Sequence, residues 1–378
     1  MIYFDNNATT KIAPEVFEAM KPYLSEKYGN PSSAYSFSKE SRSAISKARE
    51  NVADLLGAGN PNEIVFTSGG TESDNWAIFG TLESEREKTH IVTTRVEHEA
   101  VRKVCEKLEK NGFEVTWIDV DEEGLLDPDI LKESLRENTA LVSVMWANNE
   151  TGVLFPVEEI AQIVKGGSDA IFHVDAVNAA GKIPIDLKNT EIDLLSISGH
   201  KFHGPKGIGA LYIRSGVALP SLKIGGGQEQ GRRAGTEAIH QIAGIGEAAK
   251  LVSDLSPMNE VGKLRDRLEN EILNNIPKSR LNGSKINRLP NTSNISFENL
   301  NGEVLLAKLS DLGICVSTGS ACNEENHTPS EILQAMDVPF SYAMGSIRFS
   351  LGRYNSEEEI AAVLDILPGI IGEANNLI

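Results

Sequence analysis

The stretch SGHKFHGPKG, residues 198–207, decides how the rest of the chain is interpreted. It lies between two short apolar segments, 193–197 and 209–213, which both have the composition of strands. Glycines and a proline surround Lys201, so we expect a tight turn in place of a helix. A lysine held at the end of a strand can be kept from water, which lowers its pKa and lets its amine attack a carbonyl. A solvated loop lysine is the alternative interpretation.

Strands and helices alternate through most of the chain. We predict helices at 14–24, 38–56, 72–87, 98–111, 127–137 and 156–165, and strands at 63–67, 90–94, 114–119, 140–147, 170–175, 193–198 and 209–213. This alternation predicts an α/β fold in which a mostly parallel sheet has helices on both faces. Ligands of such sheets bind beyond the carboxyl ends of the strands.

The pattern changes after a helical region at 237–276 that is interrupted near Pro257. We predict strands at 292–298, 314–317 and 345–350 and helices at 302–312, 330–336 and 356–367, typical of a smaller α+β domain. A chain of 378 residues also favours two domains, because single cores rarely exceed about 250–300 residues. We therefore expect a large domain of residues 13–256 and a small domain of residues 1–12 and 257–378.

The composition argues against several classes of partner. The formal net charge is −18, from 36 basic and 54 acidic residues, so we expect no nucleic-acid partner and no anionic membrane surface. No apolar run approaches the roughly 18 residues of a membrane span, and the N-terminus has no secretory pattern. The three cysteines, Cys105, Cys315 and Cys322, form no CxxC pair, which favours reduced thiols and a cytoplasmic protein with no metal site.

Two motifs follow strands of the expected sheet. In TSGGTESDN (67–75), Gly70 permits close backbone approach and Thr71 offers a hydroxyl and an amide at a helix N-terminus. That combination suits a phosphate, although a glycine turn with a threonine cap gives the same pattern. In HVDAVNAAGK (173–182), Asp175 ends an apolar strand, where a carboxylate either caps a turn or pairs with a buried cation.

Other candidates stand alone in the sequence. His98 lies at a strand-to-helix junction, where a histidine usually caps the helix. Arg348 lies inside an apolar strand and needs an anionic partner, either a substrate carboxylate or an internal acid. Cys322 lies in a polar loop, exposed enough to react, whereas Cys105 and Cys315 occur in packed patterns.

Taken together, these motifs resemble the class V aminotransferase superfamily and, within it, the NifS/IscS-type cysteine desulfurases. The resemblance runs from Tyr3 to about Tyr354 and rests on FDNNATT, YGNPSS, TSGGTES, VEH, MWANNETG, HVDAVNAAGK, SGHKFHGPKG, GRRAGTE, STGSAC and SIRFSLGRYN. It implies the aspartate aminotransferase-like fold (fold type I), pyridoxal 5'-phosphate as cofactor, a homodimer and L-cysteine as substrate. Alanine would be the product.

The resemblance also implies residues that hold the cofactor. Lys201 would bind it as an aldimine, and His98 would stack on its ring and assist proton transfer. Asp175 would pair with the ring nitrogen, and Asn178 would face the phenolic oxygen. The phosphate would be held by Gly70, Thr71, Ser198 and His200, with Thr236 reaching in from the other subunit.

Substrate and sulfur involve three further residues. By the same resemblance, Asn149, at the cofactor, and Arg348 would hold the substrate carboxylate. Cys322 would take the sulfur as a persulfide, supply it for iron–sulfur cluster assembly through an acceptor or scaffold protein, and can transiently contact a cluster. Asn178 stands where relatives usually carry glutamine, and the loop after Cys322 reads NEENHT in place of a Ser/Thr-rich run. A selenocysteine lyase and a catalytically silent scaffold of a sulfur-transfer complex are the alternative functions.

Overall fold

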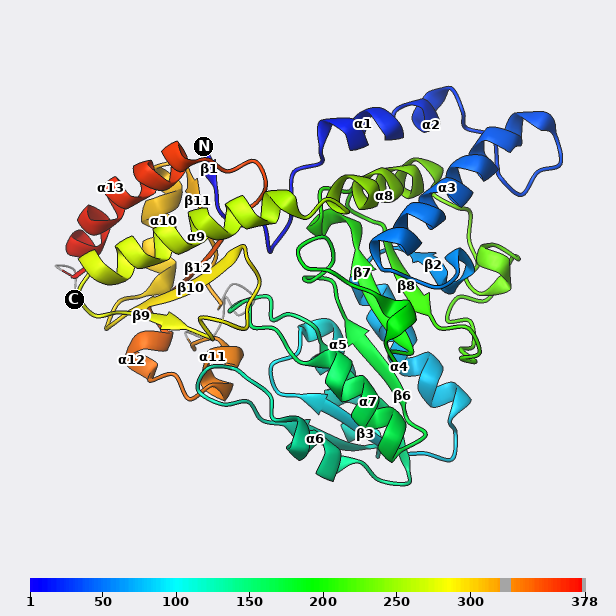
Figure 1. The fold of residues 1–378 in the computed structure, drawn as a ribbon, viewed down its shortest axis with the longest axis horizontal. Helices are drawn as coiled ribbons and strands as arrows, with labels where there is room; N and C mark the ends of the chain where they lie inside the picture. Colours follow the sequence, from blue (N-terminus) through cyan, green and yellow to red (C-terminus); the bar gives the residue numbers. More distant parts are fainter. Residues whose placement is uncertain (320–327, 376–378) are drawn as a thin grey trace.

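A seven-stranded sheet forms the centre of the larger lobe (Figure 1). The computed structural model describes residues 1–319 and 328–375. The strand order is β2 (Ile64–Thr67), β8 (Gly209–Ile213), β7 (Leu194–Ser198), β6 (Ile171–Asp175), β5 (Thr139–Met145), β3 (His90–Thr94) and β4 (Glu114–Ile118). The neighbours from β7 to β4 are parallel, and β8 is antiparallel to both β2 and β7. The prediction of a mostly parallel sheet is confirmed.

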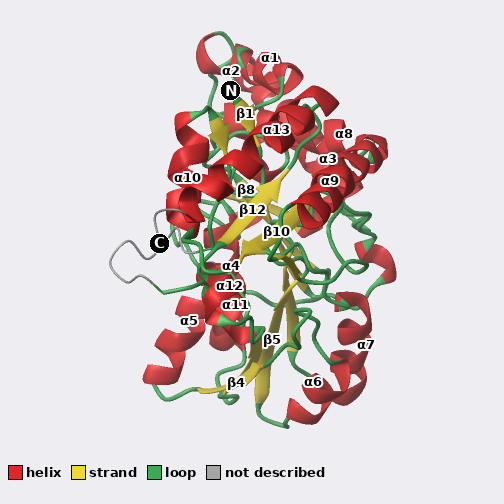
Figure 2. Cartoon of the chain, turned by 90° about the vertical axis from the view of Figure 1, so that its left-hand side faces the viewer, coloured by secondary structure: helices red, strands yellow, loops and turns green. Residues whose placement is uncertain are grey.

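Helices cover both faces of this sheet (Figure 2). Ile91 packs with apolar residues of α4 (Gly70–Ser84) and α5 (Glu99–Lys110), whereas its neighbour Val92 belongs to the cluster that includes α7 (Val157–Gly167). Side chains alternate between the faces of a strand, so a strand buried on both faces is apolar throughout. The same lobe contains α1 (Pro14–Met20), α2 (Pro22–Ser25), α3 (Lys39–Leu55), α6 (Pro128–Ser134) and α8 (Ile239–Val252).

The smaller lobe is built on a three-stranded antiparallel sheet, β12 (Ser346–Ser350), β10 (Thr292–Phe297) and β9 (Ser279–Asn282). The N-terminal β1 (Ile2–Tyr3) belongs to the same lobe, where it pairs with β11 (Ile314–Cys315) in a separate two-stranded sheet. The helices α9 (Ser256–Asn275), α10 (Gly302–Asp311) and α13 (Glu357–Asn375) pack around these strands (Figure 1). Phe4 and residues of the last helices share a second hydrophobic core. This core supports our proposed division into two domains, although Ile332 and Leu333, in α11 (Glu331–Ala335), pack with the first core.

The predicted element bounds are wrong in several places. The helix expected at 14–24 is two helices, because Pro22 has no N–H to continue the first one. The last helix continues past Pro368, since Ile370 and Ile371 are buried beyond it. The polar strand β9 and the short α12 (Phe340–Ala343) were not predicted. None of the helices within the described ranges is long and apolar enough to cross a bilayer.

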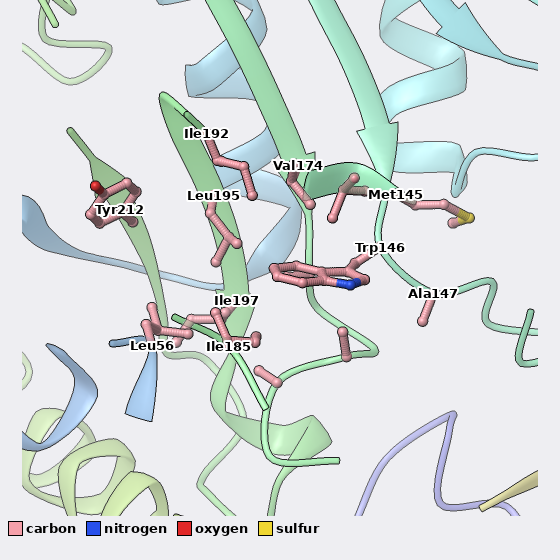
Figure 3. Packing of buried hydrophobic residues seen from close by; sticks show 14 of the residues in the cluster. Leu56, Met145, Trp146, Ala147, Val174, Ile185, Ile192, Leu195, Ile197 and Tyr212 are labelled. Atoms are coloured by element: carbon pink, nitrogen blue, oxygen red, sulfur yellow. The ribbon is translucent and has the colours of Figure 1, made fainter. Parts of the chain in front are cut away.

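The large core reaches the end of β7, directly before the turn that carries Lys201. Leu195 and Ile197 of β7 lie close to the indole of Trp146 and to Val174 of β6 (Figure 3). Ile197 is fully buried. Packing at this point therefore fixes where the strand ends and where the next residues turn.

We expect Ile197→Ala to lower the free energy of unfolding by about 2–5 kcal/mol, because the substitution removes buried methylene groups and leaves a cavity. Ile224→Ala is the matched control, since Ile224 is 93% exposed, and it should change the value by no more than about 0.5 kcal/mol. Urea denaturation of the two variants measures the difference. Equal midpoints would contradict this role of Ile197.

Candidate active site

Lys201 lies in the tight turn that the sequence predicts. The turn is a short 3-10 helix, Gly199–Lys201, directly after β7. A Cβ on Gly204 would lie 2.7 Å from the carbonyl oxygen of Gly199, so only glycine fits where the chain folds back. The Nζ of Lys201 donates to the carbonyl oxygen of Asn7. Burial and the charge of Arg348 lower the pKa of Lys201 to about 8, which excludes the solvated loop lysine.

Asp175 ends β6, beside the strand that leads to Lys201. Its Oδ1 accepts the N–H of Val177 at 2.8 Å, so the carboxylate does cap a turn. It also faces cations: burial raises the pKa of Asp175, and the charges of His98 and Lys201 oppose this rise. The cap is thus present, and pairing of this carboxylate with a buried cation stays a prediction.

The N-terminus of α4 meets the end of β7, and we expect this cradle to bind an anion. A Cβ on Gly70 would lie 2.6 Å from Val177 and 3.6 Å from the Cβ of Ser198, so the glycine allows this approach. Gly70 and Thr71 begin the helix, where backbone N–H groups lack intrahelical acceptors and favour negative charge. His200 follows Ser198, and burial together with nearby lysine charges lowers its pKa to about 4.

Glu72 supports this cradle and was missed by the sequence analysis. Its carboxylate accepts the N–H of Ser68 at 2.9 Å and pairs with Arg233 at 2.9 Å and with Lys223 at 3.0 Å. Burial opposes ionisation, but these bonds hold the pKa of Glu72 at about 2. The ion pair between Glu72 and Arg233 thus joins the TSGGTE and GRRAGTE motifs. Neither motif alone predicts this contact.

His98 caps α5, as the sequence suggests. Its Nδ1 accepts the N–H of Ala100 at 3.1 Å, and the neutral ring therefore carries its proton on Nε2. The side chain is exposed and lines a pocket of about 120 Å³ together with Asn149. The cap orients the ring and leaves the Nε2 proton available for transfer.

Asn149 and Arg348 meet where the two lobes join. The guanidinium donates to the carbonyl oxygen of Asn149 at 2.9 Å and pairs with Asp5 at 2.7 Å. The internal acid that the sequence offered as one alternative is thus Asp5. Among the described residues, Asn149 Oδ1 and Arg348 Nε are buried without a partner. A polar ligand bound here can pair with both atoms.

Two predicted cofactor contacts lie at different depths. Asn178 is buried, and its Nδ2 donates to the carbonyl oxygen of Asn148 at 3.4 Å. Thr236 is exposed on the loop before α8 of this single chain. Its contact with the other subunit stays a prediction.

The cysteines fall into two groups. Cys105 is fully buried, which raises the pKa of its thiol to about 12, and Cys315 pairs with Tyr3 between β11 and β1. Cys322 lies outside the described residues, but Gly319 and Thr328, on either side of that segment, both line the pocket that contains His98. Within the described ranges, no group of three or more His, Cys, Asp or Glu side chains is placed to hold a metal ion.

Comparison with known proteins agrees with this geometry. Residues 2–363 match the family model described as aminotransferase class-V. A cysteine desulfurase of Trichormus azollae is 53% identical over 98% of this chain and 93% of its own length. Cysteine desulfurase NifS of Azotobacter vinelandii is 47% identical over 100% of this chain and 94% of its own length. The solved structure of a NifS-like protein superimposes with a TM-score of 0.93 at 41% identity, covering 98% of this chain and 99% of that one.

The chain therefore belongs to the class V aminotransferases, which are pyridoxal-phosphate enzymes of fold type I. Within that family it belongs to the NifS/IscS-type cysteine desulfurases. The site residues fit the cofactor: Lys201 offers an amine of lowered pKa, Asp175 offers a carboxylate, and a Cβ at Gly70 would narrow the phosphate cradle.

The pKa of Lys201 predicts how fast the cofactor attaches. Because the value lies near 8 instead of 10.5, the amine loses its proton as the pH rises through 8. The rate at which apo-enzyme gains its visible absorption should rise about tenfold per pH unit below that midpoint and then level off. Lys201→Ala is the control and should gain no borohydride-reducible band. A midpoint near 10.5, or full turnover in Lys201→Ala, would show that a group other than the Lys201 amine binds the cofactor.

The two roles of Asp175 can be separated. Asp175→Asn keeps an oxygen that accepts the Val177 N–H and removes the charge. We expect unchanged melting temperature and a turnover lower by about tenfold to a hundredfold, because a buried charge-assisted bond contributes about 1.5–3 kcal/mol. Asp175→Ala should lose both stability and turnover. If Asp175→Asn turns over like the wild type, the carboxylate acts only as a cap.

Proposed function

We propose that this chain converts L-cysteine to L-alanine and transfers the sulfur through Cys322, with pyridoxal phosphate held at Lys201. The observation that carries the proposal is the amine of Lys201, which lies in the tight turn after β7, donates to the carbonyl oxygen of Asn7 and has its pKa lowered to about 8 by burial and the charge of Arg348. Bound there, pyridoxal phosphate withdraws electrons from the substrate Cα, and a carboxylate at the ring nitrogen strengthens that withdrawal.

The remaining side chains orient the amino acid and move its protons. The unpaired Arg348 Nε supports binding of an anionic group beside the pocket, and the unpaired Asn149 Oδ1 supports binding of an N–H donor there. A substrate carboxylate there would be charge-assisted by the guanidinium. The exposed His98 carries a proton on Nε2 and lines the same pocket, so it can exchange protons with a substrate held in it.

Sulfur transfer to Cys322 balances without an oxidant. The thiolate of Cys322 attacks the substrate sulfur, so an S–S bond forms while the C–S bond breaks and carbon gains a proton. The products are alanine and a protein persulfide. Because Gly319 and Thr328 line the pocket, the chain enters and leaves the 320–327 segment beside the substrate-binding residues.

The proposal includes a cytoplasmic homodimer that passes sulfur to an acceptor for iron–sulfur cluster assembly. Exposed apolar side chains gather between residues 17 and 37, a face that a second copy of the chain would cover: Phe17, Leu24, Tyr28, Tyr35 and Phe37. The free thiols of Cys105 and Cys315 are consistent with a reducing compartment. The acceptor is a protein that carries a nucleophilic thiol.

Product analysis tests the reaction itself. Purified holoenzyme should release alanine and, with a reductant, sulfide from L-cysteine in equal amounts. Turnover of selenocysteine but not of cysteine would favour the selenocysteine lyase. Failure with both would favour the silent scaffold.

Replacement of Cys322 tests the sulfur route. Cys322→Ala should keep the cofactor and bind cysteine, yet form no persulfide and release at least about tenfold less alanine, because Cys105 is buried and Cys315 lies within the β1–β11 pair. Cys105→Ala and Cys315→Ala are matched controls and should retain most activity. Mass spectrometry maps the added sulfur after treatment with cysteine. Sulfur on Cys105 or Cys315 would refute the assignment.

A further inference from the structure

A second lysine is buried beside the site and has no place in the reaction proposed above. Lys182 follows β6 in the motif HVDAVNAAGK and is 7% exposed. It forms no salt bridge with any described residue, and the charged side chains that act on its pKa, Lys201 and Arg348, are both cations. Burial and these two charges hold the pKa of Lys182 well below its ordinary value. A buried lysine without a counter-ion needs another explanation.

The partners of Lys182 are amide oxygens. Its Nζ donates to Asn178 Oδ1 at 2.7 Å and to Asn7 Oδ1 at 3.0 Å. Both acceptors are neutral amide oxygens, so neither supplies a counter-charge. The cavity beside Lys182 and Lys201 measures about 20 Å³, which leaves room for about one water and little hydration for a charge.

These bonds determine which way the Asn178 amide points. An amide can face a ligand with either its oxygen or its nitrogen, and its neighbours decide which. Lys182 is a donor and therefore holds Oδ1, which turns Nδ2 to the other side. One N–H of Nδ2 points to the carbonyl oxygen of Asn148 at 3.4 Å. The second is left for a ligand.

The second partner of Lys182 leads back to the reactive amine. Asn7 is buried, and its Oδ1 also accepts from Asn291 Nδ2 at 3.0 Å. The backbone carbonyl oxygen of the same Asn7 accepts the Nζ of Lys201. One buried amine thus contacts the amide that faces the ring and the residue that holds the reactive lysine.

We propose that Lys182 is a positioning residue that holds the Asn178 amide with its nitrogen toward the cofactor, so that the phenolic oxygen receives a hydrogen-bond donor. This rests on the proposed function, since it requires pyridoxal phosphate at Lys201 with its phenolic oxygen toward Asn178. Lys182 acts through the amide, whose oxygen accepts its Nζ.

The proposal predicts a shift in the ionisation of the bound cofactor. A donor at the phenolic oxygen stabilises the form that has lost the proton shared between this oxygen and the Lys201 nitrogen. In Lys182→Met the amide is free to rotate, the donor is lost and the midpoint of the visible absorption change should rise by about one pH unit. The titratable and charged groups that face this region are unchanged by the substitution: Asp5, Asp175, His200, Lys201, His203 and Arg348.

A double-mutant cycle tests whether Lys182 acts through Asn178. Reconstituted holoenzymes of the wild type, Lys182→Met, Asn178→Ala and the double variant are titrated and followed by absorption. Lys182→Met should raise the midpoint in the Asn178 background and leave it unchanged in the Asn178→Ala background. Lys188→Met is the matched control: Lys188 is an exposed lysine a few residues later and should cause no shift. Equal midpoint shifts in both backgrounds would show that Lys182 acts on the cofactor without Asn178, which would overturn the proposal. No shift in either background would also overturn it.

A second variant and the cofactor absorption of the wild type separate failure of the Lys182 role from failure of the proposed function. If Lys182→Met does not fold, Lys182→Gln enters the same cycle, because its shorter amide does not reach both acceptors, and the same dependence on Asn178 is expected. If wild-type protein gains no visible absorption with pyridoxal phosphate, the proposed function fails. If holoenzyme forms but the two substitutions act independently, the role of Lys182 alone is refuted.

Discussion

The site depends on one electrostatic constraint: the amine of Lys201 is held against a neutral carbonyl oxygen instead of a carboxylate. Within the described part of the chain Lys201 forms no salt bridge, and burial together with the nearby charge of Arg348 lowers its pKa. In a low-dielectric site, two neighbouring positive charges repel each other strongly. Loss of the lysine proton relieves that repulsion, and a neutral amine is the form that can bond to an aldehyde.

The fold satisfies this constraint by bringing distant segments together. Asn7, from the N-terminal segment, supplies the carbonyl oxygen, and its own N–H donates to the Ser350 hydroxyl at 3.0 Å. Its amide nitrogen donates to Thr292 at 2.8 Å, on the central strand of the small sheet. The residue that holds the reactive lysine is thus itself held by the smaller lobe. Movement between the lobes would therefore change the surroundings of Lys201 directly.

The sequence predicts the residues that lie within local motifs. Lys201, Asp175 and Gly70 each stand at a strand end or a helix start, and neighbouring residues impose that geometry. The partners of these residues could not be predicted in the same way. Asp5 lies 343 positions from Arg348, and Lys182 lies 175 positions from Asn7, so only the completed fold brings each pair together.

The elements that were missed have a similar explanation. β9 reads SRLN, with no apolar alternation, and exists because its backbone pairs with β10. β1 is two residues long and depends on β11 in the same manner. Strands such as β1 and β9 form because their backbone pairs with a neighbouring strand, whereas the apolar composition of β5 and β7 already predicts a strand. Likewise, Glu72 reads as an ordinary first-turn acid until Arg233 is seen beside it.

Paired and unpaired buried polar atoms lie close together where the substrate is expected to bind. The buried Asn7 has a partner for its amide oxygen, its amide nitrogen and both of its backbone groups. Asn149 Oδ1 and Arg348 Nε, a short distance along the same network, have none among the described residues. Leaving such an atom unpaired costs about 1–3 kcal/mol, so a fold that satisfies Asn7 completely gains nothing from leaving these two open. A ligand that pairs with them recovers that cost on binding: a carboxylate can accept from Arg348 Nε, an N–H group can donate to Asn149 Oδ1, and an amino acid carries both groups.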